Sequence, residues 1–128
     1  EANMKSSVIV LFVSLFSPTT AIAADSDERY SNYGSGTQSC ETYVKAREDS
    51  RNGEERIELV FLTWLNGFLS AHNYYVTNTY DIKGTTDNEA LLVWLENYCK
   101  QNPRKSFSSA VAALADELYP KRIQQAPK

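Results

Sequence analysis

The stretch NGEERIELVFLTWLNGFLSAHN, residues 52–73, carries the clearest structural signal in the chain. Apolar residues recur in it every three or four positions, which is the spacing of one face of an α-helix; they are Ile57, Phe61, Trp64, Leu65, Phe68 and Ala71. Further apolar residues fall on the other faces, namely Leu59, Val60, Leu62 and Leu69. A helix that is apolar almost all round is buried on several sides. The sequence therefore predicts a central helix on which the rest of the domain packs.

The start of this central helix is predicted from a capping pattern. Asn52 can cap the first turn, and Glu55 follows it at the spacing of a capping box. Glu54 and Glu55 also suit the positive end of the helix dipole. Gly67 lies inside the helix, where glycine costs about 1 kcal/mol relative to alanine. We therefore expect Gly67 to permit a close crossing by another helix.

Three further helices are predicted on either side of the central one. The first begins near Ser39 or Cys40, carries a narrow stripe that ends at Arg47, and stops near Asp49. The next opens with the capping box Thr86-Asp87-Asn88-Glu89 and is broken by Asn102-Pro103. The last is capped by Asn102 or Ser106 and ends at Pro120; its apolar stripe is Phe107, Val111, Leu114 and Leu118. Residues 73–86 between the second and third helices are expected to be a structured loop.

Residues 4–23 have the pattern of a secretory signal peptide, preceded by an extra leader at residues 1–3. Met4-Lys5 supplies the positive start, 8–16 is an apolar run, and Ala21-Ile22-Ala23 is a small-x-small cleavage pattern. A membrane anchor is the alternative, but a spanning helix needs roughly 20 apolar residues. We expect cleavage near Ala23-Ala24 and a periplasmic or secreted product with no stable membrane anchor.

The remaining chain divides into a flexible lead-in at 24–38, a helical domain at 39–120 and a polar tail at 121–128. The chain has a net charge of −3 and contains no cluster of Lys or Arg. Both features argue against nucleic acid as a partner. In an oxidising compartment, Cys40 and Cys99 are expected to form a disulfide, since the helical stripes direct both to the core. Two buried free thiols are the alternative. The predicted fold class is a compact all-α domain of four helices with one disulfide.

The sequence offers little for catalysis, and we expect no catalytic residue, no metal and no cofactor. His72 is the single histidine, and a zinc site there would need three further carboxylates. The carboxylates Glu54, Glu55 and Glu58, and the pair Asp116-Glu117, are expected to be solvated charge. No phosphate-binding or dinucleotide-binding glycine motif is present.

Tyrosines are numerous, and several gather after the central helix. Tyrosine suits interfaces because its ring packs while its hydroxyl stays hydrated, although the same residues could instead close the end of the bundle. Our candidate partner-binding residues are Asn66, His72, Asn73, Tyr74, Tyr75, Tyr80 and Asp81.

The landmarks Ser39-Cys40-Glu41-x-Tyr43, 64–73 and 94–103 resemble those of small exported bacterial helical proteins. The plan is similar to the HdeA/HdeB-type acid-stress chaperones and to the Rap/Tai-type immunity proteins, which neutralise peptidoglycan amidases delivered by type VI secretion. The resemblance implies a non-enzymatic protein that binds a protein partner, as an immunity-type inhibitor of a cell-wall-degrading effector. An acid-activated periplasmic chaperone is the alternative, a hydrolytic enzyme is a weaker one, and a homodimer is an open option.

Overall fold

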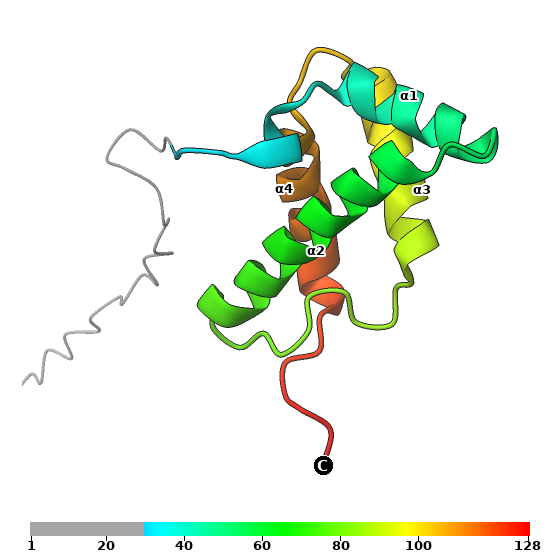
Figure 1. The fold of residues 1–128 in the computed structure, drawn as a ribbon. Helices are drawn as coiled ribbons and strands as arrows, with labels where there is room; N and C mark the ends of the chain where they lie inside the picture. Colours follow the sequence, from blue (N-terminus) through cyan, green and yellow to red (C-terminus); the bar gives the residue numbers. More distant parts are fainter. Residues whose placement is uncertain (1–29) are drawn as a thin grey trace, which may run out of the picture. The chain divides into compact units, whose positions relative to one another are not determined.

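The computed structural model describes residues 30–128, and Ser31–Lys128 forms a compact helical unit (Figure 1). Its elements are η1 (Gly34–Thr37), α1 (Cys40–Arg51), α2 (Arg56–Tyr75), α3 (Asn88–Gln101), α4 (Phe107–Leu118) and η2 (Tyr119–Lys121), where η denotes a 3-10 helix. The described residues thus confirm the predicted all-α domain of four helices. None of these helices is long and apolar enough to span a bilayer. The predicted signal peptide, residues 4–23, lies outside the described residues.

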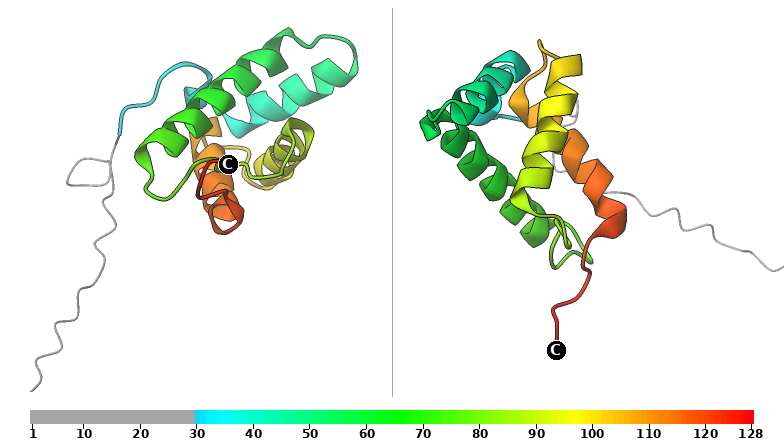
Figure 2. Two further views of the ribbon diagram at one scale, coloured as in Figure 1. Left: turned by 90° about the horizontal axis from the view of Figure 1, so that it is seen from below. Right: turned by 90° about the vertical axis from the view of Figure 1, so that its right-hand side faces the viewer.

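The helices pack as two consecutive pairs. Helices α1 and α2 run side by side and are joined by a tight turn, and they lie across the pair formed by α3 and α4 (Figure 2). The disulfide Cys40–Cys99, with 4.7 Å between its Cα atoms, links the start of α1 to the end of α3. This confirms the predicted pairing and closes the two pairs against each other at one end.

The core is centred on aromatic rings that come from three helices. Tyr43 of α1, Phe61 of α2 and Phe107 of α4 are fully buried, with ring centroids 4.8–5.3 Å apart. The Tyr43 hydroxyl donates to the carbonyl oxygen of Leu92 at 2.9 Å, so its one polar atom is satisfied inside the core. The predicted stripe of the last helix, from Phe107 to Leu118, is buried as expected.

The caps correct several predicted helix boundaries. Helix α1 runs to Arg51, so Asn52 is its C-terminal cap and cannot also begin α2. Helix α2 begins at Arg56 after Glu55, which makes no side-chain capping bond. Asp87, rather than Thr86, caps α3 by accepting from the backbone N–H of Ala90. Ser106, one of the two predicted candidates, caps α4.

Residues at both ends of the helical unit contact the four helices or the loops between them. The 3-10 helix η1 packs on α2: the Trp64 indole N–H donates to the Tyr33 carbonyl oxygen at 2.8 Å, and Gly36 is buried beside the same ring. At the other end, Ile123 forms an antiparallel bridge with Asp81. Helix α4 stops at Leu118, and Pro120 falls in the following 3-10 turn rather than ending the helix itself.

The predicted loop after the central helix is shorter than expected, because α2 extends through Tyr75. The remainder is held down by Ile82, which is fully buried, and by the bridge to Ile123. The described part of this loop forms no strand, and Asp81 makes one of the two isolated bridges found in residues 30–128.

Candidate functional site

Four of the candidate partner-binding residues face solvent. Tyr74 and Tyr75 at the end of α2 are 81% and 78% exposed, and Tyr80 in the following loop is 50% exposed. The rings of Tyr74 and Tyr75 meet edge to face at 4.8 Å. Asn66 is exposed on α2, two turns before Tyr74. We refer to Tyr74, Tyr75 and Tyr80 below as the tyrosine surface.

Two further candidates, Asn73 and Asp81, are placed to support the fold. The Asn73 side-chain oxygen accepts from the Ile82 backbone N–H at 2.8 Å and so fixes the loop on the end of α2. Asp81 forms the bridge to Ile123, and its carboxylate accepts from the Lys83 backbone N–H. These side chains are occupied within the chain, and we leave them out of the proposed surface.

His72 is half-buried, and its ring lies 6.5 Å from that of Phe68. Burial lowers the pKa of His72 below its ordinary value of 6.5, against a smaller opposite effect of Asp116. Its Nδ1 atom is buried without a hydrogen-bond partner. Among the described residues, no nucleophilic side chain lies within hydrogen-bond distance of His72 Nδ1.

The outer face of α2 corrects the expectation of a helix packed on several sides. Phe61, Leu65 and Leu69 are buried, but Ile57, Leu59 and Val60 are each more than half exposed. The segment from Leu59 to Tyr80 contains no Asp, Glu, Lys or Arg. A helix that turns an uncharged face to solvent over most of its length is unusual, because such faces ordinarily carry charged residues. This run is the sequence signal that would have indicated the exposed face.

The middle of this outer face carries small side chains. Its central line runs through Val60, Thr63, Gly67, Ser70 and Tyr74, at alternating spacings of three and four residues. A Cβ atom added to Gly67 would meet no neighbour within 4 Å. The predicted close crossing at Gly67 by another helix of the same chain is therefore wrong within the described structure.

A shallow apolar hollow of about 350 Å³ opens at the N-terminal end of this face. It is lined by Gly34, Ser35, Leu59, Val60, Thr63 and Trp64. The 3-10 helix η1 forms one wall, held there by the bond from the Ser35 hydroxyl to the Val60 carbonyl oxygen.

The opposite side of the unit holds an ion-pair network that the sequence analysis missed. Arg47 of α1 is buried and contacts Glu58 of α2 at 2.6 Å, Glu89 of α3 at 2.6 Å and Glu96 of α3 at 3.3 Å. Glu58 is therefore not solvated charge, as expected above, but a nearly buried partner of Arg47. Fixed charges here tie α1, α2 and α3 together.

Glu96 lies at the centre of this network. Its carboxylate also accepts from Arg51 at 3.0 Å and from Lys100 at 2.7 Å. The hydrogen bond from Arg51, together with that from Lys100, lowers the pKa of Glu96 to about 2 although its burial acts in the other direction. Positions of Arg and Glu on different helices give no periodic pattern, so only the packed structure reveals the pairing.

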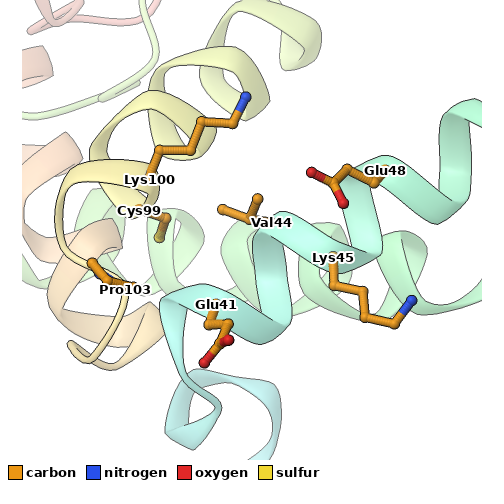
Figure 3. A pocket seen from close by; sticks show the side chains of 7 residues that line it. All are labelled: Glu41, Val44, Lys45, Glu48, Cys99, Lys100 and Pro103. Atoms are coloured by element: carbon orange, nitrogen blue, oxygen red, sulfur yellow. The ribbon is translucent and has the colours of Figure 1, made fainter.

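A second hollow, of about 400 Å³, lies between α1 and α3 beside the disulfide (Figure 3). Val44 points into the space between the two helices, while Glu41 and Lys45 extend away from it. The amines at its rim are already paired, Lys45 with Asp49 and Lys100 with Glu96. Both amines that line this hollow are thus occupied within the chain.

No group of three or more His, Cys, Asp or Glu in residues 30–128 is arranged to hold a metal ion. Comparison of the chain with family models, with curated proteins and with solved structures gave no significant match.

Proposed function

We propose that this protein acts by binding another protein, without catalysis, and that the tyrosine surface at the end of α2 is the contact region. The observation that carries the proposal is the exposure of Tyr74, Tyr75 and Tyr80 on an anchored scaffold. Large exposed aromatic residues are enriched at interface hot spots, where they bury much area at little entropic cost.

The scaffold beneath this surface is firm, which favours a preformed binding region. The loop that carries Tyr80 is fixed by Asn73 below it, by buried Ile82 and by the bond from the Tyr80 backbone N–H to the Ile123 carbonyl oxygen. A loop held on rigid helices commonly carries recognition. Little conformational entropy would then be lost on binding.

The partner that we propose is a cell-wall-degrading effector, with this protein as its immunity-type inhibitor. The support is the resemblance to Rap/Tai-type proteins together with an exposed, uncharged aromatic surface. The test is inhibition of purified type VI peptidoglycan amidases at neutral pH. Amidase activity is measured as the release of cleaved peptide. We expect full inhibition by a stoichiometric amount of the protein.

The variant that tests the tyrosine surface combines Tyr75→Ala with Tyr80→Ala. It should weaken inhibition at least about tenfold, as the loss of hot-spot residues does. Tyr33→Ala is the matched control, because Tyr33 is 77% exposed and lies before η1. Its backbone carbonyl oxygen, which accepts from Trp64, is kept in this variant. Inhibition that is equally strong in all three proteins would refute the tyrosine surface. Turnover of peptidoglycan by the protein alone would instead establish the hydrolytic enzyme.

An acid-activated chaperone is the second candidate, and the Arg47 network is the observation that favours it. Three carboxylates hold Arg47 in place, so protonating them at low pH would leave a buried guanidinium without partners. The test is suppression of aggregation of an acid-labile protein at about pH 3 and at neutral pH. Protection at acid pH alone, unaffected by Tyr75→Ala with Tyr80→Ala, would support the chaperone over the inhibitor.

A further inference from the structure

We propose that the outer face of α2 is a homodimer interface, in which the α2 helices of two copies pack antiparallel and cross at Gly67. The dimer would use Tyr74 of the tyrosine surface and would leave Tyr75, at the end of α2, and Tyr80, in the following loop, for the effector. It does not depend on the target of the proposed inhibitor. It follows from the symmetry of the face about Gly67.

A two-fold axis through the middle of α2 brings unlike ends of the face together. Val60 and Tyr74 each lie seven residues from Gly67, or about 10 Å along a helix that rises about 1.5 Å per residue. Rotation about an axis at Gly67 therefore places Tyr74 of one copy at the height of Val60 of the other. An isologous interface requires this reciprocity, in which one residue meets another and the second meets the first.

The surface shape fits the same arrangement. The apolar hollow lined by Leu59, Val60 and Thr63 lies at the height where the axis places the other copy's Tyr74. Tyr74 is 81% exposed and is the largest side chain on the central line. It can thus act as the knob that fills the hollow, twice in each dimer.

The middle of the face allows the two helices to approach closely. The interaxial distance between packed helices depends on the side chains at the contact, and here those are Thr63, Gly67 and Ser70. These residues lie between Val60 and Tyr74 at the three-and-four spacing of a two-helix seam. Gly67 is a helix-destabilising residue with open space around it, so a close approach by a second copy gives it a role that the single chain does not.

The electrostatics also favour a second copy. The central line between Val60 and Tyr74 carries no charge, so neither copy must desolvate an ion. Antiparallel α2 helices place the positive end of each macrodipole beside the negative end of the other. Exposed Arg56, near the start of α2, then lies towards the C-terminal end of the partner helix, where a cation is favourable.

The first test is the mass of the purified protein in solution, measured by sedimentation equilibrium over a range of concentrations without any target. We expect a reversible dimer with a dissociation constant in the micromolar range or tighter, the range of specific interfaces. A protein that stays monomeric at about 100 µM overturns the proposal, even if another partner covers this face of α2.

The second test uses Gly67→Glu, which adds a charge on the axis of the proposed dimer. Each folded chain has room for this side chain, so helix content should be unchanged while the dimer dissociation constant rises at least about tenfold. Asn97→Glu adds the same charge at an exposed position of α3 and should leave the dimer intact. Equal dissociation constants for the two variants would overturn the proposal.

A cross-link fixes the geometry independently of affinity. Gly67→Cys should form an intermolecular disulfide on mild oxidation, because the axis brings the two copies of residue 67 together within disulfide range. Asn97→Cys should not. A dimer that forms with no cross-link through residue 67 would place the interface elsewhere and refute the assignment.

Discussion

Two sides of this small helical unit differ in how their side chains are engaged. On the α1–α3 side, the disulfide and the Arg47 network join three helices through buried, fully engaged groups. On the outer face of α2, large apolar and aromatic side chains stand exposed, and Gly67 contacts nothing. The difference separates the buried contacts that hold the helices together from the exposed face that we propose for binding, so substitutions on each side should have distinct consequences.

The largest stability effect should come from removing the disulfide. Cys40→Ser combined with Cys99→Ser opens a cross-link that spans 59 residues of sequence. The chain-entropy account gives a loss of about 4 kcal/mol in the free energy of unfolding. Urea denaturation followed by circular dichroism measures the loss. A change below about 1 kcal/mol would show that the α1–α3 side is held mainly by packing.

The next largest effect should follow Arg47→Met, which leaves Glu58 and Glu96 without their buried cation. Loss of one partner from a buried ion pair costs about 3–5 kcal/mol, and we expect about 3 kcal/mol because Glu89 remains exposed to water. Arg51→Met is the control, since Arg51 is half exposed and its loss should destabilise the fold much less than the loss of Arg47. Equal losses in urea denaturation would contradict a special role for Arg47.

The pH dependence of unfolding tests the same side by titration. The folded state holds the pKa of Glu96 at about 2, below its ordinary value of 4.5, so this group stabilises the fold above pH 4.5. That stabilisation is lost as the pH falls from about 4.5 to about 2, because the unfolded chain takes up the proton first. Half-exposed Arg51 and Lys100 limit the expected loss to about 1–2 kcal/mol.

Glu96→Gln is the matched variant for this titration. It should be less stable than the parent protein at neutral pH, and its stability should fall less across the acid range. Urea midpoints measured at a series of pH values give both numbers. A parallel fall in the two proteins would assign the acid sensitivity to other carboxylates.

The smallest effect comes from Gly67, and it is compared with Gly36, which lies against the Trp64 ring. Gly67→Ala should raise the free energy of unfolding of the monomer by about 0.5–1 kcal/mol, because the new methyl group meets nothing and alanine favours helix. Gly36→Ala should lower it, because a Cβ atom there would overlap the Trp64 ring. Thermal denaturation of dilute samples decides between the signs. A loss of monomer stability in Gly67→Ala would mean that the face is covered within the chain.

Much of the fold could be predicted because it depends on local periodicity. The stripe from Phe107 to Leu118 repeats at helical spacing, and it is buried as that spacing requires. The pairing of Cys40 with Cys99 followed from two stripes that direct both sulfurs inward. The capping residues were less secure, because Asn52 fits either the end of one helix or the start of the next, and only the length of α1 decides between them.

The candidate site could be predicted only in part. The exposed tyrosines were found from residue type and position, while Asn73 and Asp81 proved to be occupied by the loop they hold. Local sequence cannot distinguish a polar side chain that faces a partner from one that bonds the backbone nine residues away.

By itself, the sequence determined the four helices, their apolar stripes and the disulfide, since each depends on residue type and spacing along the chain. Only the tertiary structure decided which side of α2 is left exposed, and that Arg47 lies among carboxylates from two other helices. The physical reason is that periodicity states that a face is apolar but not what covers it. An ion pair between distant segments depends on packing geometry, which has no local signature.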